Sequence, residues 1–384
     1  MKNGTALVAV AMLSGGVAFS NGGWPIFRGA QTLDGVAGGQ LSDSLELFWT
    51  FKTKGPVKSS PVRCKGRVFV GSDDGFVYAI DAATGKEAWS FKTEGAVEAP
   101  PLVVGGTVFV GSSDMFLYAL DADKGELRWK YQTAGKVLGA ANVSPAAPGG
   151  GLCAWSNTAL VIVGSYDNKV HCVEAATGKA AWTFETGSYV NGTPALATGN
   201  GTNTLAVVVG CDGKLRALDA ANGKQRAEVE VGEYIAGSAA VAGSRAYVGH
   251  YGNEVACVDI ESRKVMWTFK DRAFPYFSSP AVTDQFILIG GRDKRLHCLE
   301  REKGTQVWEF VTRGNVDSSP VVCGDKVVFG SSDGRLYMVG LNNGREIWSY
   351  DVGAEITASP AVANGVVVIG AHDGSVYAFG SKKD

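Results

Sequence analysis

One phrase recurs eight times along this chain, and the repetition constrains the fold more than any other feature. In outline it reads Val-Phe-Val-Gly-Ser-x-Asp-Gly-x-Val-Tyr-Ala-Leu-Asp-x-x-Thr-Gly-Lys-x-x-Trp-x-Phe. Such a period is typical of repeat folds, so the 384 residues are expected to form one body rather than two or three domains. The first glycine of the phrase stands at Gly71, Gly111, Gly164, Gly210, Gly249, Gly290, Gly330 and Gly370, with spacings of 40, 53, 46, 39, 41, 40 and 40 residues.

Each unit divides into four short segments that have the character of β-strands. In the first unit the inner strand is expected to begin with the phrase at 57–62, followed by strands at 67–70, 76–81 and 87–92. Asp74-Gly75 supplies the positive φ that a tight hairpin needs. The 52 glycines and the scarcity of helical periodicity argue against crossover helices. Four strands in about 40 residues form one propeller blade, so the sequence predicts an all-β, eight-bladed β-propeller.

The two ends of the chain are expected to close the ring. The eighth unit stops at Phe379-Gly380, before its outer strand, whereas an unassigned strand containing Trp49 precedes the first unit at 46–52. Pairing of this N-terminal strand with the last blade would leave no open sheet edge there. We therefore divide the chain into a signal peptide (1–20), a lead-in segment (21–45), the propeller (46–380) and a C-terminal tail (381–384).

The first 20 residues have the pattern of a secretory signal. Lys2 precedes an apolar run at 6–17, and the small residues Ala18 and Ser20 stand at the −3 and −1 positions of a cleavage site. The run is shorter than the ~20 residues that span a bilayer, although an uncleaved anchor is the alternative. We expect an exported, periplasmic or extracellular monomer. Its net charge of −2 favours neither nucleic acid nor an anionic membrane as partner, and no other segment could span a membrane.

The sequence contains no pattern that predicts a catalytic or metal site. The Gly-x-Ser-x-Gly stretch at 330–334 lies in a repeated hairpin, not in the strand–turn–helix that a hydrolase needs. Among the histidines, His171 and His297 occupy the tyrosine position of the third strand, whereas His250 and His372 fall in turns between second and third strands. Because they belong to blades far apart, we expect structural roles for all four.

The cysteines form no disulfide framework, because their number is odd and none stand in a tight pair. Three of them occupy the alanine position of the third strand, which should be small and buried. We expect these three to be inert core thiols in separate blades: Cys172, Cys257 and Cys298.

Tryptophan follows the same period as glycine. The phrase Ala-x-Asp-x-x-Thr-Gly-x-x-x-Trp, as in Ala79, Asp81, Gly85 and Trp89, resembles the docking motif of quinoprotein (PQQ-like) propeller repeats. The resemblance covers 49–380 and implies that each tryptophan stacks on the glycine turn of a neighbouring blade. The tryptophans concerned are Trp49, Trp89, Trp129, Trp182, Trp267, Trp308 and Trp348, and the missing member would stand at Ala227.

One position of the inner strands varies while its neighbours stay uniform, which suggests individual roles around a channel mouth. Its residues are Lys58, Glu98, Leu138, Asn191, Ala236, Phe277, Asp317 and Thr357. As binding candidates we select Lys58, Glu98, Asn191, Phe277, Asp317 and Thr357. The alternative is a water-filled pore with paired charges.

Aromatic residues gather in the loops that enter the fourth to sixth blades. Tyr189, Tyr234 and Phe274 should open on the same face as the varied position and would suit a protein or peptide partner. Packing of these rings against neighbouring loops is the alternative. Insertions at 142–158, with Trp155, and at 199–203 should project from the opposite face.

Two functional classes remain. The resemblance extends to proteins of the BamB type, which take part in outer-membrane assembly and bind other proteins. It also extends to dehydrogenases that hold PQQ and calcium in the channel. The dehydrogenases carry an adjacent cysteine pair that this chain lacks, and only Glu98 and Asp317 offer carboxylates at the varied position. We expect a non-enzymatic scaffold without a cofactor, and a sensor or polysaccharide-binding role belongs to the same binding class.

Overall fold

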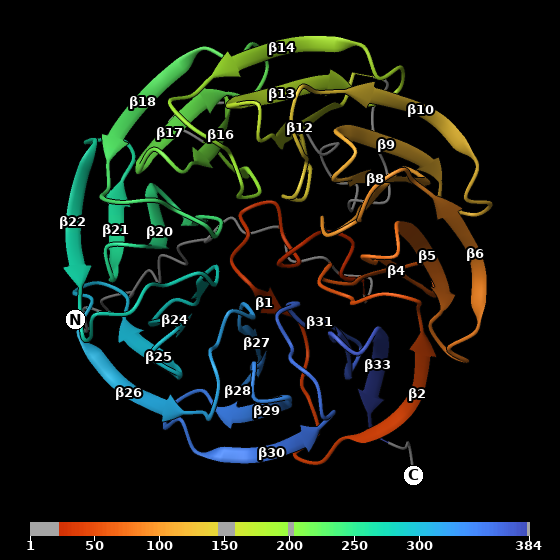
Figure 1. The fold of residues 1–384 in the computed structure, drawn as a ribbon. Coiled ribbons are helices and arrows are strands. Elements are labelled where there is room, and N and C mark those ends of the chain that lie inside the picture. Colours follow the sequence, from red (N-terminus) through yellow and green to blue (C-terminus); the bar gives the residue numbers. More distant parts are fainter. Residues whose placement is uncertain (1–22, 145–157, 199–202, 382–384) are drawn as a thin grey trace, which may run out of the picture.

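The computed structural model describes residues 23–144, 158–198 and 203–381. These residues form eight sheets around a central axis, which confirms the eight-bladed β-propeller (Figure 1). The expected signal peptide, Trp155 with most of its insertion, and 382–384 of the tail lie outside the described residues. Within the described part of the chain, no helix is long and apolar enough to cross a membrane.

We number the blades 1 to 8 in the order of the repeated phrase. Blades 1 and 2 consist of β3 (Val62–Cys64), β4 (Arg67–Gly71), β5 (Phe76–Asp81), β6 (Glu87–Lys92), β7 (Leu102–Val104), β8 (Thr107–Gly111), β9 (Phe116–Asp121) and β10 (Leu127–Gln132). Blades 3 and 4 consist of β11 (Asn142–Ser144), β12 (Leu160–Gly164), β13 (Lys169–Glu174), β14 (Ala180–Glu185), β15 (Ala195–Thr198), β16 (Thr204–Val209), β17 (Lys214–Asp219) and β18 (Gln225–Glu230). Blades 5 and 6 consist of β19 (Ala240–Ala242), β20 (Arg245–His250), β21 (Glu254–Asp259), β22 (Lys264–Phe269), β23 (Ala281–Val282), β24 (Phe286–Gly291), β25 (Arg295–Glu300) and β26 (Gln306–Val311). Blades 7 and 8 consist of β27 (Val321–Cys323), β28 (Lys326–Gly330), β29 (Arg335–Gly340), β30 (Glu346–Asp351), β31 (Ala361–Ala363), β32 (Val366–Gly370), β33 (Ser375–Gly380) and β2 (Glu46–Lys52), while the short β1 (Val36–Ala37) adds to blade 7.

The inner strands are shorter than the sequence suggested. The pairing of β3 with β4 begins only at Val62. The segment 57–61 leads into β3 but does not pair with a strand of its own blade. Pro61 has no N–H for a ladder bond, and the backbone before it bonds to the next blades instead. The N–H of Val57, for example, donates to the carbonyl of Ala371 in blade 8 (3.0 Å). The outer two strands of blade 1 match the prediction at both ends.

The position of the repeated glycine also needs one correction. In blade 1, Gly71 pairs with Val77. The equivalent pair in blade 4 is Val209 with Leu215, so Val209 and not Gly210 occupies the glycine position. At Gly71 a Cβ would collide with Val97, the residue that opens the next blade. At the corresponding junction Val209 packs in one cluster with Ile235, so this junction accommodates a side chain.

Strand β2 closes the ring as predicted. It pairs antiparallel with β33 over the whole strand, from Glu46 opposite Gly380 to Lys52 opposite Ser375. Figure 1 shows β2 as the outer strand of blade 8, beside the end of the chain. The first and last described parts of the propeller are thereby joined in one sheet.

Each docking tryptophan lies over the glycine turn of the next blade. The indole N–H of Trp89 donates to the carbonyl of Ala122 (3.0 Å), and its ring covers Gly125, where a Cβ would come within 2.6 Å of the ring. The φ of Gly125 is 75°, a conformation that glycine adopts without strain. The same pair forms at five further junctions: Trp49 with Gly85, Trp129 with Gly178, Trp182 with Gly223, Trp267 with Gly304 and Trp308 with Gly344.

The remaining two junctions depart from this pattern. Ala227 stands where blade 4 lacks its tryptophan, and the turn that would receive the ring contains Arg263 (φ 58°) where the other turns have glycine. The side chain of Arg263 reaches back and donates to the carbonyl of Arg226 (2.9 Å). At the closing junction Trp348 packs edge-on against Phe379, with ring centroids 5.5 Å apart.

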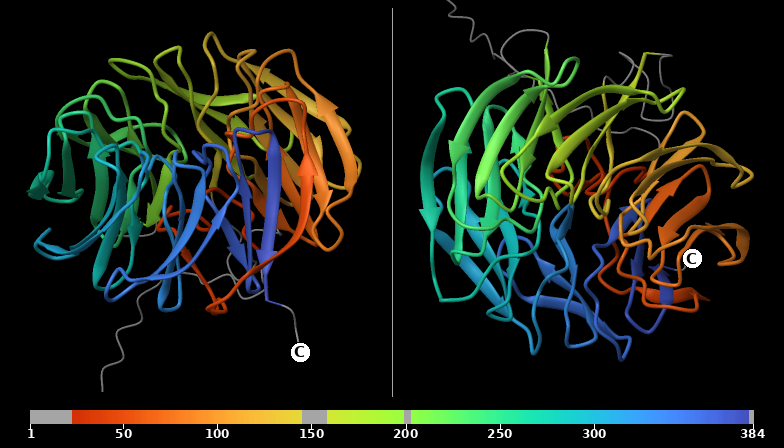
Figure 2. Two further views of the ribbon diagram at one scale, coloured as in Figure 1. Left: turned by 60° about the horizontal axis from the view of Figure 1, so that its bottom comes forward. Right: turned by 45° about the horizontal axis from the view of Figure 1, so that its top comes forward.

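The lead-in segment lies inside the ring of sheets, where Figures 1 and 2 show it in red. Its carbonyl groups accept hydrogen bonds from one inner strand after another, from Val103 in blade 2 to Val322 in blade 7. Arg28 is 1% exposed and donates to the carbonyl of Pro280 (3.0 Å), and burial lowers its pKa to about 9. The segment therefore closes one end of the channel.

Candidate functional site

The channel has one closed and one open end. The inner strands run from the loops that enter the blades toward the turns that the lead-in segment covers. The turn between β4 and β5 returns to the entering loops, because the N–H of Asp73 donates to the carbonyl of Pro56 (2.9 Å). We call the side with these loops and turns the entry face. The varied position lies on this face, at the open end.

The residues of the varied position form a ring around this opening, here called the mouth ring. All eight are partly exposed, although the residue before each of them is buried. Neighbours in the ring also contact one another. The amide of Asn191 donates to the carbonyl of Ala236 (2.7 Å), and the ammonium of Lys58 lies 4.0 Å from the carboxylate of Glu98.

Below the mouth ring, hydroxyl groups join the inner strands of neighbouring blades. The backbone N–H of Ser319 donates to the hydroxyl of Ser359 in the next blade (3.0 Å), and Ser359 repeats this bond to Ser60 (2.8 Å). Four more bonds of this kind connect Ala140 to Thr193, Thr193 to Ser238, Ser238 to Ser279, and Ser279 to Ser319. These uniform positions build the scaffold that holds the mouth ring in place.

One half of the mouth, on blades 8, 1 and 2, is polar. Lys58 forms an ion pair of 2.6 Å with Asp73, and this hydrogen bond raises the pKa of its ammonium, as does the charge of Glu98. Thr357 shares a hydrogen bond of 2.8 Å with His372, in the turn between β32 and β33. Lys58 is therefore shared between two carboxylates, and the three charges leave this half net negative.

The other half of the mouth, on blades 3 to 6, is aromatic. Tyr189 stacks on Tyr166 with centroids 4.8 Å apart and an interplanar angle of 3°. Farther round, Tyr251 contacts both Tyr234 and Phe277, each with centroids 4.6 Å apart. The hydroxyl groups of Tyr166 and Tyr234 lie beside each other and interact, which joins the two sets. We call these five residues the aromatic arc.

Arg292 ends the aromatic arc. Its guanidinium lies over the Phe277 ring, 3.4 Å from the centroid, and donates to both oxygens of Asp317 (3.1 and 2.9 Å). The cation therefore has its planar face on an aromatic ring and its edge on a carboxylate, an arrangement that suits arginine. This fixes two mouth-ring residues that the sequence analysis selected, Phe277 and Asp317.

The structure thus brings together most of the predicted residues, but it divides them between the two halves. Phe274 stands apart: its side chain is exposed, and in the described residues it takes part in no ring–ring contact. Sequence analysis missed Tyr166, Tyr251 and Arg292. All three occupy one repeat position, in or beside the turn between second and third strands, which Asp73 holds in blade 1. That position varies as much as the mouth ring, and comparing it across repeats would have found them.

The mouth offers few groups that could hold calcium-bound PQQ. Calcium requires carboxylate oxygens that are free to bind it. Asp317 is engaged through both oxygens by Arg292, and this guanidinium also covers the face of Phe277. In the polar half, Lys58 pairs closely with Asp73 and lies 4.0 Å from Glu98. Oδ1 of Asp73 is buried without a hydrogen-bond partner, so Glu98 and Asp73 are the carboxylates that could hold a cation here.

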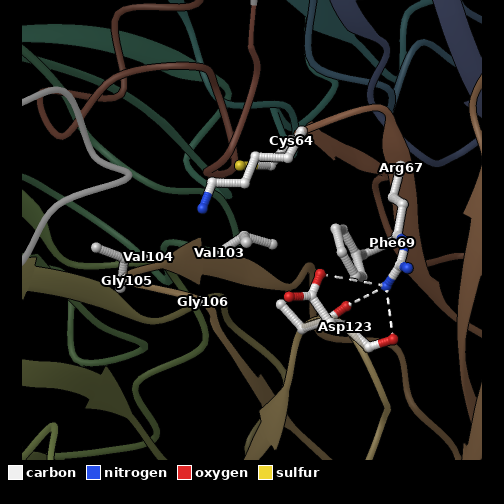
Figure 3. Close-up of a pocket in the computed structure, with 10 residues that line it drawn as sticks. Cys64, Arg67, Phe69, Val103, Val104, Gly105, Gly106 and Asp123 are labelled. Atoms are coloured by element: carbon white, nitrogen blue, oxygen red, sulfur yellow. Dashed lines mark hydrogen bonds and ion pairs between the residues drawn. The ribbon is translucent and has the colours of Figure 1, made fainter.

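A separate hollow opens between blades 1 and 2 on the side opposite the entry face (Figure 3). It is lined by Cys64, Phe69 and Val103, among others, and Arg67 bridges its rim to Asp123. The same guanidinium nitrogen donates to the carbonyls of Ala122 and Asp123 (2.7 and 2.8 Å). This arginine joins the two blades, and Lys65 is the other charged side chain that lines the hollow.

The three cysteines of the third strands have the placement expected of core residues, and three of the four histidines are buried. Cys172, Cys257 and Cys298 are all 0% exposed, and burial raises the pKa of each thiol, to about 12, 11 and 12 respectively. His171 lies in the third strand of its blade as predicted, but His250 is the last residue of β20 rather than a turn residue. The strand continues because blade 5 has a one-residue longer ladder, with His250 paired to Glu254.

His250 makes the stability of the fold depend on pH. It is 2% exposed, and burial lowers its pKa, because the charged form loses its hydration. Below about pH 6.5 the unfolded chain binds a proton that the folded chain resists, so stability should fall as the pH falls. Each unit of difference in pKa corresponds to about 1.4 kcal/mol. Urea midpoints at pH 7.5 and 5.5 should differ more for the parent than for His250→Asn. Equal differences would contradict this origin.

Comparison with known proteins identifies relatives of the whole propeller. The sequence matches the family described as outer membrane protein assembly factor BamB over residues 37–154, 131–226 and 211–383. A search of the curated proteins gave no match. Among solved structures, BamB from Moraxella catarrhalis is 19% identical and superposes with a TM-score of 0.70, covering 89% of this chain and 99% of that chain. The computationally designed Ika8 protein is 15% identical (TM-score 0.71, 89% and 100% covered), and quinohemoprotein alcohol dehydrogenase from Comamonas testosteroni is 13% identical (TM-score 0.74, 95% and 82% covered). At these identities the solved structures show a shared fold.

Proposed function

The chain belongs to the family of the outer membrane protein assembly factor BamB, and from this premise we propose that it is an exported, non-enzymatic scaffold that binds a protein or peptide partner at its entry face. The observation that carries the proposal is the aromatic arc. It consists of two sets of ring contacts over four consecutive blades and ends at Arg292. Aromatic residues and arginine are the side chains most enriched in the centres of protein interfaces.

Exposure of the arc supports binding rather than core packing. Tyr189 and Tyr251 are 47% and 43% exposed, and Phe274, in a loop that enters the next blade, is 48% exposed. Tyr189 is held by stacking and Tyr251 by two ring contacts, so a partner would meet side chains that are already ordered. Fixing side chains in advance lowers the entropy cost of association.

The name of the family supports the class of partner. The relatives are named for the assembly of outer membrane proteins, and we extend this to the present chain as part of the proposal. The expected signal peptide would deliver the chain to the same compartment. A quinone dehydrogenase is the alternative, and the engagement of Asp317 and of the Phe277 ring by Arg292 speaks against it.

Site-specific crosslinking in exporting cells tests the face. A photoreactive phenylalanine analogue at Tyr189 or Tyr251 is expected to give adducts with envelope proteins. The matched controls are Lys86 and Lys303, which are equally exposed but lie in turns on the opposite side. Adducts from the lysine positions alone would overturn the assignment of the entry face.

Binding of the captured partner gives the energetic test. Tyr251→Ala is expected to weaken it by about thirtyfold, the loss of about 2 kcal/mol that is typical of a central aromatic contact. Lys86→Ala should leave the affinity unchanged. The cofactor alternative is tested on the same protein by titrating PQQ and calcium while following tryptophan fluorescence and dye-linked oxidation of alcohols. Saturable calcium-dependent binding with turnover would replace the scaffold proposal.

A further inference from the structure

Three side chains with metal-binding chemistry meet at the junction of blades 5 and 6. They are Asp271, in the loop that follows β22, His297 in β25 and Glu309 in β26. One ring nitrogen of the histidine and one oxygen of each carboxylate lie within 4.8 Å of one another. His297 and Glu309 are direct partners in the β25–β26 register, so the sheet itself places these two side by side.

His297 presents one nitrogen with an available lone pair. Its Nε2 is engaged with a carboxylate oxygen of Asp293 (2.8 Å), whereas Nδ1 is buried and has no hydrogen-bond partner. The side chain is 0% exposed. A histidine that donates one N–H to a carboxylate has its tautomer fixed and its second nitrogen free, which is the usual arrangement of a metal-bound histidine. Nδ1 is therefore the nitrogen that can bind a cation.

Blade 3 has a histidine at the same repeat position, but both of its ring nitrogens have hydrogen-bond partners. His171 binds Asp167 through Nε2 (2.9 Å), but its Nδ1 shares a hydrogen bond with the hydroxyl of Tyr131 (3.1 Å). Tyr131 belongs to the outer strand of blade 2, which precedes blade 3. The equivalent residue in the outer strand of blade 5, which precedes blade 6, is Phe269, and it has no hydroxyl group. The unused lone pair of His297 is thus specific to blade 6 and does not follow from the repeat.

Neither carboxylate stands beside the histidine of blade 3, although blade 4 has a glutamate, Glu228, at the position of Glu309. Where blade 6 has Glu309 opposite its histidine, blade 3 has Thr183 opposite His171. Where the segment beyond β22 has Asp271, the segment beyond β10 has Thr133. Histidine, aspartate and glutamate therefore replace the ordinary residues of the repeat at one place, within reach of one another.

The carboxylates are accessible and only partly engaged. The side chains of Asp271 and Glu309 are 31% and 30% exposed. Asp271 accepts one bond from Arg272 (3.2 Å), while Glu309 accepts bonds from Arg295 (3.0 Å) and Gln306 (3.3 Å). Both acids can move, because one stands in a loop and the other has a long side chain. Solvent can therefore deliver an ion to the group.

We propose that Asp271, His297 and Glu309 bind a divalent first-row transition metal ion, of the Zn²⁺ class, between blades 5 and 6. With ligand bonds of about 2.0–2.2 Å, tetrahedral ligand atoms lie about 3.3–3.6 Å apart, so the two acids move inward by about an ångström on binding. Three protein ligands leave one position for water. The ion would fix the 270–275 loop, which carries Phe274, against blade 6.

Variants that restore the ordinary residues of the repeat provide the test. His297→Tyr introduces the residue found at this position in four other blades, Asp271→Thr copies Thr133, and Glu309→Thr copies Thr183. Each is therefore expected to fold. Purified metal-free protein is titrated with Zn²⁺ by calorimetry and with Co²⁺ by visible absorption, and thermal unfolding is followed in parallel. We expect one bound ion per chain and a rise in Tm with Zn²⁺ in the parent.

Each of the three variants is expected to weaken Zn²⁺ binding at least tenfold and to abolish the rise in Tm. His171→Tyr is the matched control, since it makes the same change at a histidine whose Nδ1 faces the hydroxyl of Tyr131 instead of two carboxylates, and it should leave binding unchanged. All variants keep the cysteines, so zinc held by thiols would bind equally to each of them. Undiminished binding in His297→Tyr, or no binding in the parent at micromolar Zn²⁺, would overturn the proposal.

Discussion

A chain that begins at Ser44 instead of Asn21 is expected to lose at least about 7 kcal/mol of unfolding free energy, or to fail to unfold cooperatively. Five large side chains of the lead-in segment are buried, and burying each contributes about 1.5–3 kcal/mol. The lower end of the summed range applies, because the unfolded chain already buries some of this area. The five are Trp24, Ile26, Phe27, Leu33 and Leu41.

Lost hydrogen bonds add to this effect. The N–H groups of Val103, Leu196, Val241, Val282 and Val322 donate to carbonyls of the lead-in segment, and truncation leaves them without these acceptors. Calorimetry and urea unfolding of the two chains measure the difference. A chain that begins at Gly23 is the control and should match the longer one. Equal unfolding midpoints for the chain from Ser44 would show that the ring closes without its lead-in segment.

Trp89→Ala is expected to cost about 3–5 kcal/mol, the usual loss on truncating a large buried aromatic side chain. Trp89 is 8% exposed and covers Gly125 of the next blade. Because the next blade has no side chain at Gly125 to fill the space, the cavity cannot close easily. Chemical denaturation at one pH, with Trp89→Phe as the matched variant, measures the cost. The phenylalanine variant retains an aromatic ring but loses the bond to Ala122, and should cost less.

The blade 4–5 junction gives this prediction an internal comparison. There Ala227 and Arg263 stand in place of tryptophan and glycine, and the guanidinium of Arg263 reaches back to blade 4. Arg263→Ala should therefore cost far less than Trp89→Ala, about 0.5–1.5 kcal/mol for one hydrogen bond. If the tryptophan variant also cost less than about 1 kcal/mol, docking would not be what holds neighbouring blades together.

The fold could be predicted from the sequence to near-residue detail. The strands β2, β5 and β6 begin and end where the alternation of residues and the Asp-Gly and Thr-Gly turns indicated. Turn chemistry and period-two alternation are local properties, and eight copies make them unmistakable. The predicted extent of the inner strands was wrong. The neighbouring blades decide how these segments hydrogen-bond, as the bond from Val57 to Ala371 illustrates.

The candidate site could be predicted only in part. Comparing repeats at one position found Phe277 and Asp317, but not Arg292, which binds both. The histidines were assigned structural roles because they do not approach one another. That reasoning did not consider carboxylates. Glu309 reaches His297 from the paired strand β26, and Asp271 reaches it from the loop after β22 of the neighbouring blade.

By itself the sequence determined the number of blades, their strand order, the closure by β2 and the docking of six of the seven tryptophans, because each depends on one repeat and its nearest neighbour. Only the tertiary structure decided which varied residues meet across blades. Tyr166 and Tyr189 come from a turn of one blade and the loop that enters the next. Arg292 and Asp317 are placed in the same way, 25 residues apart, and the ring brings each pair to the same edge. Such contacts depend on the curvature of the closed ring, and no local pattern encodes that curvature.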